Sequence, residues 1–391
     1  MKMQIQMMPQ RRCLRVISCF AMCLVFMVLV SPSIADHLTL EIDGKTYDLD
    51  GEILIEAQDS SLYFRENNGK IWFVQPDQIK IKEDTDDEVA PISKKELGEK
   101  LLAELPEGFR IYETKHYVIA YQNEIAYARW IGNLYEVRLF KGFEAYWKRR
   151  KKFKLTETEF PLVAIIFGNK AEYQRHVDRE LGPGQNMVAY YNVQNNRVTM
   201  YDLTADNVPV GVELNDRKIE QVLQNPAAIN MVATVIHEGT HQLLFNRGIQ
   251  TRFADCPLWV NEGLAMYFEA PDLQSKRGWQ KPGLIFQQRL LRFIDYVKRR
   301  PADSLETLIS EDNRLRQQDS ALDAYAEAWA LNHFLLTRRS KDYVKYLEHL
   351  AAKKPLEIDT KEQRLSEFKD YFGDDLVKLD REFLSYISRL R

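Results

Sequence analysis

The residues best suited to chemistry form the run His237-Glu238-Gly239-Thr240-His241, an H-E-x-x-H sequence. Two histidines four residues apart on a helix lie one above the other on one face, so both imidazoles can reach a single metal ion. Imidazole nitrogen is a common ligand of zinc. Glu238 lies about 100° further round the helix than His237. That position suits a carboxylate beside a water at the metal, so we expect Glu238 to be the general base.

The flanking sequence places this motif in the middle of a helix. Asn225 is a suitable N-cap, and Pro226 suits the first helical position. Gly248 suits the position just after a helix end. Between them, residues at helical spacing form an apolar stripe, which consists of Ile229, Val232, Ala233, Ile236, Thr240 and Leu244. Burying the polar groups of the motif with no metal or partner would cost several kcal/mol, which favours a metal site over a polar patch.

A catalytic zinc usually has three protein ligands and one open position. The candidates for the third ligand are Asp255, Glu262, Glu269 and His333.

Residues 257–269, PLWVNEGLAMYFE, resemble the gluzincins, the zinc peptidases that include thermolysin and the aminopeptidase N group. Their pattern is H-E-x-x-H followed by a glutamate ligand on a second helix, commonly within an Asn-Glu-Gly or Asn-Glu-Ala run. Glu262 matches that ligand, so the resemblance implies one zinc ion held by His237, His241 and Glu262. The metzincin pattern is excluded, because Leu244 and Arg247 stand where a glycine and a third histidine would fall.

The resemblance extends over roughly residues 97–391. TKHYVIAY, FPLVAIIFG, NRVTMYDL and DAYAEAWALNHFLL are similar to segments of a bacterial family of exported gluzincin-like proteins. It implies that Tyr325 stabilises the oxyanion and that the strand of NRVTMYDL is the sheet edge that pairs with an extended peptide. Thermolysin-like enzymes orient a histidine with an aspartate where this chain has Met266, so we expect Glu269 to take that role.

The glycine-x-methionine-glutamate-asparagine motif that holds a free amino terminus in the aminopeptidase group is missing. The resemblance therefore implies a zinc metallopeptidase with a peptide or protein substrate, and an endopeptidase is favoured over an aminopeptidase. Two alternatives to a metallopeptidase stay open. The first is a non-catalytic binding or scaffold protein of the cell envelope, and the second is an enzyme that hydrolyses the amide bonds of peptidoglycan cross-links.

The elements that must position these residues indicate an α+β fold. Residues 36–83 contain alternating runs separated by Asp-Gly and Asn-Gly pairs, which predict five short strands in a small antiparallel, barrel-like module. Residues 84–95 are predicted to be an acidic linker. Residues 96–224 mix helices and strands, including a helical stretch at 123–152. Residues 225–391 are predicted to be mostly helical and to carry the zinc site.

Residues 1–35 are predicted to be a signal peptide, with a basic start, an apolar run at 16–30 and cleavage before Asp36. We therefore expect an exported protein, periplasmic, in the cell envelope or secreted. An uncleaved segment would be its only membrane attachment. Three of the four cysteines lie in this segment, and Cys256 remains. The segment has four basic residues and no acid, so its removal takes the net charge from −3 to −7. Nucleic acid is not an expected partner.

The other reactive residues are expected to be structural. Cys256 has no paired base motif and suits a small buried residue. His333 is interpreted as a packing residue, and His116 and His176 have no chemical partner in sequence. The basic run at residues 148–152 is interpreted as a solvated helix end.

Overall fold

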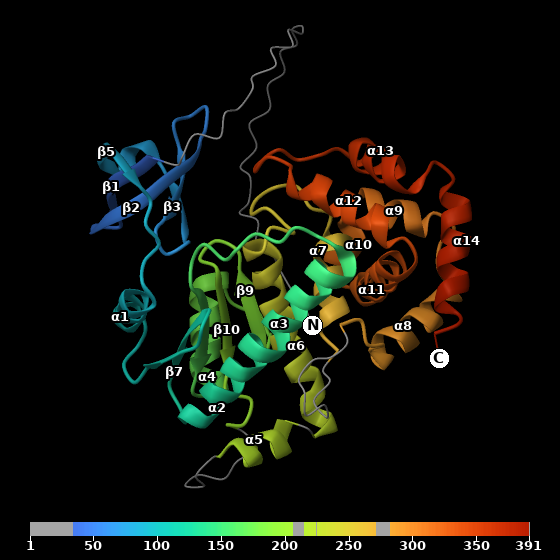
Figure 1. Ribbon diagram of the computed structural model, residues 1–391, viewed down its shortest axis with the longest axis horizontal. Coiled ribbons are helices and arrows are strands. Elements are labelled where there is room, and N and C mark those ends of the chain that lie inside the picture. The colour runs from blue at the N-terminus through green and yellow to red at the C-terminus, as the bar shows by residue number, and fades with distance from the viewer. Residues whose placement is uncertain (1–33, 206–214, 224, 271–281, 391) are drawn as a thin grey trace, which may run out of the picture. The chain divides into compact units, whose positions relative to one another are not determined.

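The computed structural model describes residues 34–205, 215–223, 225–270 and 282–390 (Figure 1). The chain divides into two compact units, and the boundary between them in the sequence lies between Ile92 and Ser93. Nearly all of the predicted signal peptide lies outside the described residues, which begin at Ile34. Within them, no helix is both long enough and apolar enough to cross a bilayer.

The first unit is one open antiparallel sheet in the order β4-β3-β2-β1-β5. Its strands are β1 (Ile34–Ile42), β2 (Lys45–Glu56), β3 (Leu62–Glu66), β4 (Ile71–Val74) and β5 (Ile79–Glu88), with a short 3-10 turn, η1 (Pro76–Gln78). One face is buried and contains Leu38, Leu40, Leu49, Leu62, Phe64 and Val74. The predicted antiparallel sheet is confirmed, but β4 and β5 form open edges and the sheet does not close into a barrel.

Two predictions in this unit were wrong. The Asp50-Gly51 pair was expected to be a hairpin turn, yet β2 runs straight through it. A Cβ at Gly51 would lie 2.1 Å from the carbonyl oxygen of Arg65, so this glycine permits the close approach of β3. Residues 84–88, expected in the linker, extend β5, which pairs with β1.

The second unit contains a mixed sheet in the order β6-β7-β8-β10-β9. Its strands are β6 (Arg110–Glu113), β7 (Tyr117–Tyr121), β8 (Leu162–Phe167), β9 (Ala189–Asn192) and β10 (Arg197–Tyr201). β7, β8 and β10 are parallel, whereas β6 and β9 run antiparallel at the two edges. The strand of NRVTMYDL, β10, was expected at the edge, and this was wrong. β10 lies inside the sheet, and the hairpin turn at residues 193–196 makes β9 the edge strand.

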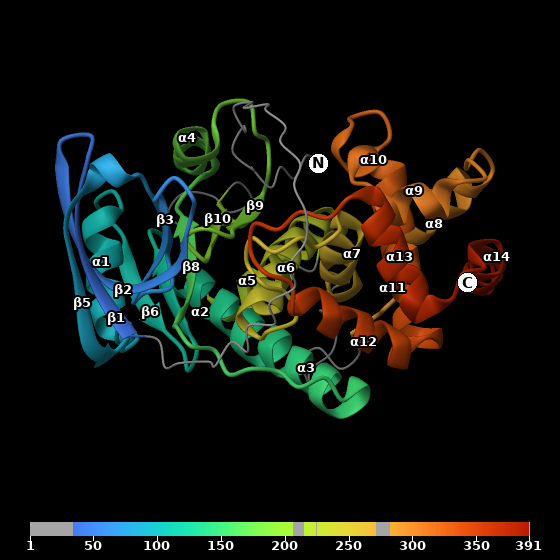
Figure 2. The same ribbon diagram turned by 90° about the horizontal axis from the view of Figure 1, so that it is seen from above.

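Helices cover both faces of this sheet. α1 (Lys94–Glu104) and α4 (Lys170–Leu181) pack on one face, and α2 (Ile125–Asn133) and α6 (Pro226–Asn246) pack on the other (Figures 1 and 2). Strand alternation explains the division. Ile165 and Thr199 point toward α4, whereas Tyr191 points toward α6. The helix that carries the H-E-x-x-H motif therefore crosses the face next to the edge strand β9.

The predicted helical stretch at 123–152 is present, but it is not a regular α-helix. After α2 it continues as a π-helical segment η2 (Leu134–Phe140), one α-turn α3 (Lys141–Glu144) and a second π-helical segment η3 (Ala145–Lys151). π-helical segments often occur at functional sites. Here η2 lies against the helix that carries the motif: the Tyr135 hydroxyl donates to the carbonyl of Val235 at 2.9 Å.

The described part of residues 225–391 is helical, as predicted. After α6 come α7 (Leu258–Phe268), α8 (Gln287–Val297), α9 (Ser304–Ser310), α10 (Asn313–Arg316), α11 (Ala321–Arg338), α12 (Ser340–Ala351), α13 (Lys361–Phe372) and α14 (Leu376–Ile387). α5 (Asp216–Leu223) precedes α6. In Figures 1 and 2, α7 lies between α6 and α11, so this region brings together three helices that carry candidate site residues.

Candidate metal centre

Three potential metal ligands converge where α6 meets α7. The Nε2 atoms of His237 and His241 are 3.1 Å apart. Glu262 brings its carboxylate from α7, with Oε2 3.4 Å from His237 Nε2 and Oε1 3.8 Å from His241 Nε2. One ligand atom from each residue can be chosen so that all lie within 4.8 Å of one another. The structure thus brings together the three predicted ligands, which are separated by up to 25 positions in sequence.

The donor atoms fit a bound cation. All three side chains are at most 3% exposed, and Glu262 Oε2 forms no hydrogen bond within the described part of the chain. His237 Nδ1 lies 2.9 Å from a carboxylate oxygen of Glu269, so Nε2 is the ring nitrogen that faces His241 and Glu262. A buried carboxylate oxygen without a hydrogen bond is unfavourable alone, and two imidazoles with one carboxylate are a zinc donor set.

Glu238 lies beside these ligands and faces the sheet edge. Its Oε2 accepts a hydrogen bond of 2.9 Å from the backbone N–H of Tyr191 on β9. Burial raises the pKa of Glu238 to about 8, with a further rise from Glu262 and an opposing effect from His237. A carboxyl group whose pKa lies near neutrality is suited to proton transfer. Because the amide of an edge strand is aimed at this carboxylate, the open edge of the sheet and the candidate base share one site.

The two histidines have opposite electrostatic surroundings. Burial lowers the pKa of His241 to about 4, so it is neutral and able to ligate a metal at neutral pH. Burial also opposes the charged form of His237, but the carboxylates of Glu262 and Glu269 raise its pKa to about 10. The carboxylates around His237 therefore favour a positive charge at this position. A bound cation would supply such a charge.

Glu269 connects the centre to a third helix. It follows α7 and contacts His237, as expected from the sequence, and it also accepts two hydrogen bonds from Arg289 on α8, at 2.9 and 3.3 Å. Burial disfavours the charged carboxylate, but Arg289 and His237 lower its pKa below the usual value. The carboxylate is therefore held ionised and fixes the tautomer of His237. Arg289 was missed from the sequence, because no motif marks an arginine 20 positions after its partner.

Tyr325 on α11 lies within the electrostatic field of the site. Burial raises its pKa well above the ordinary value, the carboxylates of Glu262 and Glu238 raise it further, and Arg289 opposes them. The hydroxyl therefore keeps its proton and is available as a hydrogen-bond donor. This predicted residue therefore interacts electrostatically with one candidate ligand, Glu262, and with the candidate base, Glu238.

The spacing residues of the motif fit the packing of α6. A Cβ at Gly239 would lie 2.8 Å from the ring of Tyr135 on η2, so a glycine allows the two helices to approach. Thr240 turns its hydroxyl back to the carbonyl of Ile236 at 2.8 Å. Gln242 donates to the carbonyls of Val163 and Asn196 at 3.0 and 2.8 Å. The contacts of Gly239 and Gln242 with other elements fix the rotation of α6, and with it the direction of its histidines.

Contacts at the first residue of α7 and in its second turn restrain this helix. The N–H of Leu258 donates to Asp312 at 2.9 Å, which satisfies one of the free amides at the helix start. At Gly263 a Cβ would lie 1.8 Å from Nδ2 of Asn332 on α11. Asn332 uses that nitrogen to donate to the carbonyl of Trp259 at 2.8 Å. Glu262 therefore projects from a helix with little freedom to shift.

The remaining candidates lie elsewhere. Asp255 forms a bidentate ion pair with Arg364, at 2.6 and 2.9 Å. His333 contacts the hydroxyl of Tyr386 at 2.8 Å and a backbone carbonyl. Burial raises the pKa of Cys256 to about 12, so its thiol is a poor nucleophile.

The two histidines expected to be structural both have carboxylate partners that the sequence did not indicate. His116 Nδ1 lies 2.6 Å from Glu136, and the imidazole stacks on Phe140 with ring centroids 4.0 Å apart. His176 Nε2 lies 3.0 Å from Glu180. Neither belongs to the group of three potential metal ligands.

Comparison with known proteins gives one family match. The model of the family described as "Protein of unknown function (DUF1570)" matches residues 231–357. A search of curated proteins gave no match. The matched segment includes the H-E-x-x-H motif together with Glu262, Glu269, Arg289 and Tyr325. Every side chain of the candidate metal centre therefore lies within the segment that is similar to this family.

Proposed function

We propose that this protein is an exported, zinc-dependent metallopeptidase that hydrolyses peptide bonds, with an endopeptidase favoured. One observation carries the proposal. Two buried imidazole nitrogens and a buried carboxylate oxygen without a hydrogen bond face one another, with a second buried carboxylate, that of Glu238, next to them. Three ligands of this kind with an adjacent acid are the constellation of a catalytic zinc site.

The residues have distinct roles in the proposed reaction. His237, His241 and Glu262 would hold one zinc ion, which when bound supplies Lewis-acid polarisation of the scissile carbonyl and lowers the pKa of water. Glu238 takes a proton from the attacking water and passes it to the leaving nitrogen. Because Oε2 is held by the Tyr191 amide, we assign the transfer to Oε1. Tyr325 donates a hydrogen bond to the developing oxyanion.

β9 supports a peptide as the substrate. It is an edge strand with β10 as its partner, and its outward amide at Tyr191 points to the base. An extended peptide can add to such an edge through main-chain hydrogen bonds, which would place a scissile bond beside Glu238. This role was first expected for β10. The topology makes β9 the strand to which we now assign it.

Cleavage of a peptide library by the zinc-loaded protein tests the proposal. We expect internal cleavage that a chelator stops and that zinc restores. Cleavage that persists with the chelator, or no cleavage of any peptide, would contradict the proposal. In the second case, zinc bound without turnover would favour the non-catalytic binding protein. A parallel digest of purified peptidoglycan separates the cross-link hydrolase from a protein-directed peptidase.

A further inference from the structure

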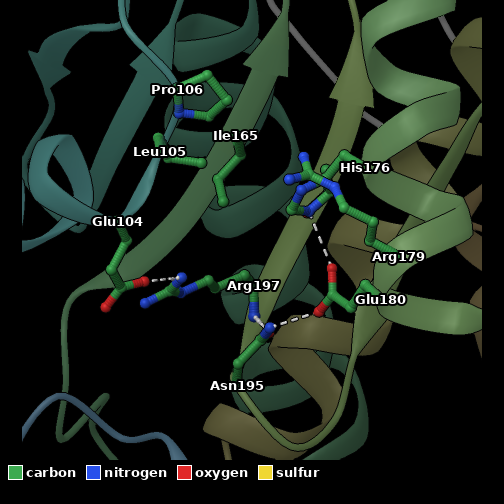
Figure 3. A pocket seen from close by; sticks show the side chains of 10 residues that line it. Glu104, Leu105, Pro106, Ile165, His176, Arg179, Glu180, Asn195 and Arg197 are labelled. Atoms are coloured by element: carbon green, nitrogen blue, oxygen red, sulfur yellow. Dashed lines mark hydrogen bonds and ion pairs between the residues drawn. The ribbon is translucent and has the colours of Figure 1, made fainter. Parts of the chain in front are cut away.

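The carboxylate of Glu180, on α4, accepts hydrogen bonds from polar side chains of the hairpin formed by β9 and β10 (Figure 3). Oε1 accepts hydrogen bonds from the amides of Asn192 at 2.6 Å and Asn195 at 2.7 Å. Oε2 accepts from the hydroxyl of Tyr190 and lies 3.0 Å from His176 Nε2. One side chain of α4 therefore contacts three residues of the hairpin.

This carboxylate is not part of the candidate metal centre. It lines a cavity of about 490 Å³ together with residues of α1, α4, β8 and β10, on the sheet face opposite α6. In Figure 3 the side chain of Glu180 points from α4 toward Asn195 at the hairpin turn. Burial alone would raise the pKa of Glu180, but its hydrogen-bond donors lower it below the usual value. The hairpin is thus tied to an ionised carboxylate.

The groups bound by Glu180 flank the residue that contacts the base. Tyr190 and Asn192 precede and follow Tyr191, and their side chains point to the α4 face because strand residues alternate. Tyr191 points to the other face, where its ring stacks on Phe245 of α6 with centroids 5.8 Å apart. β9 is therefore held from both sides, and the N–H between the two contacts is the one donated to Glu238.

We propose that Glu180 is a positioning residue, which acts through β9 to hold the Tyr191 N–H against the catalytic carboxylate of Glu238. This inference rests on the proposed function, because it assigns Glu238 as the base. β9 has four residues and an open edge, so few ladder bonds restrain it. Hydrogen bonds to an ionised group are about twice as strong as neutral ones, and Glu180 accepts two from this short strand, from Tyr190 and Asn192.

Hydrogen exchange at the Tyr191 amide in the metal-free protein tests the link directly. In Glu180→Ala we expect exchange at least tenfold faster than in the wild type, as loss of charge-assisted hydrogen bonds implies. Glu180→Gln keeps an oxygen acceptor and should recover most of the protection. Glu172→Gln on the same helix removes the same charge without touching the hairpin and should leave exchange unchanged. Unchanged exchange in folded Glu180→Ala would overturn the proposal.

Steady-state kinetics with a peptide substrate then distinguishes an effect of Glu180 on the position of the base from an effect on the stability of the protein alone. In Glu180→Ala we expect kcat to fall at least tenfold while the protein still binds one zinc ion, with partial rescue in Glu180→Gln. A normal kcat in a variant with a loosened β9 would contradict the link to the base.

If Glu180→Ala does not fold, Tyr190→Phe removes one donor and keeps the ring, and the same two measurements apply. It should raise Tyr191 exchange and lower kcat to a smaller extent, about threefold, and no change in either would overturn the proposal. The exchange measurement needs no metal or substrate. A wild type that cleaves nothing but shows Glu180-dependent protection of Tyr191 contradicts the proposed function and not the restraint of β9.

Discussion

Glu238 and His237 are neighbours in sequence, but their side chains meet different surroundings. His237 faces the carboxylates of Glu262 and Glu269, whereas Glu238 faces the backbone of β9. This division follows from the 100° turn between successive helical residues. In the proposed reaction, His237 is therefore a metal ligand and Glu238 is the residue that transfers protons.

Glu238→Gln tests that division. The amide has nearly the same shape but cannot accept a proton, so we expect full zinc content and a fall in kcat of about 10²- to 10⁴-fold. Metal analysis and peptide cleavage measure the two effects. Glu306→Gln, at an exposed position on α9, is the control. Activity near that of the wild type would mean that another group is the base.

Glu269→Gln tests the support of His237. The amide loses the charge that Arg289 and His237 both contact, so the imidazole is less well oriented. We expect zinc affinity to fall by about 10- to 100-fold, measured by competition with a chromophoric chelator. The Glu306→Gln control should bind zinc as the wild type does. An unchanged affinity would show that Glu269 does not orient the ligand.

At the scale of helices and strands, the sequence predicted where an element lies in the chain better than it predicted which other elements pair with it or pack against it. Helix periodicity together with end signals located α6, because this helix buries an apolar stripe over many residues. Edge position is a matter of long-range pairing, and nothing in the four residues of β9 marks it as the outer strand. The Asp50-Gly51 pair misled for a related reason: it carries a hairpin signature, but its glycine accommodates the carbonyl of Arg65.

Gly263→Ala tests the packing of α7 on α11. The added Cβ would meet Nδ2 of Asn332 at 1.8 Å and the carbonyl of Ala328 at 2.8 Å. We expect the free energy of unfolding to fall by about 1–3 kcal/mol, in spite of the better helix propensity of alanine. Zinc affinity should also fall, because Glu262 is the adjacent residue.

Gly98→Ala on α1 is the matched control. Its Cβ would lie 3.3 Å from the side chain of Ile111, a contact that a small shift relieves. We expect a smaller loss of stability there and no change in zinc affinity. Equal effects of both substitutions in denaturant unfolding would contradict the role of the close α7–α11 approach.

At the scale of the whole chain, the candidate site depends less on long-range contacts than the architecture does. The three candidate ligands and the candidate base follow a local motif and one resemblance within residues 237–262, and the structure brings these four side chains together. Tyr191 and Arg289 join the site only through the sheet order and the path of α8, which depend on contacts far apart in sequence. The boundary between the two units, after Ile92, falls inside the linker predicted at residues 84–95.

Zinc should stabilise the unit that contains its ligands. A ligand that binds only the folded state adds about 2.7 kcal/mol to the free energy of unfolding when its concentration is 100 times Kd. We expect added zinc to slow global hydrogen exchange in residues 93–391, and His241→Ala to abolish the effect. Exchange in α6 and α7 that is indifferent to zinc would contradict a site between these helices.

The most direct test of the central claim is an anomalous difference map, recorded at the zinc edge, from crystals of the zinc-loaded protein. The account predicts one strong peak about 2.0–2.1 Å from Nε2 of both His237 and His241, in contact with the carboxylate of Glu262. A map without a peak at these three residues, or with the zinc bound by another set of side chains, would contradict it.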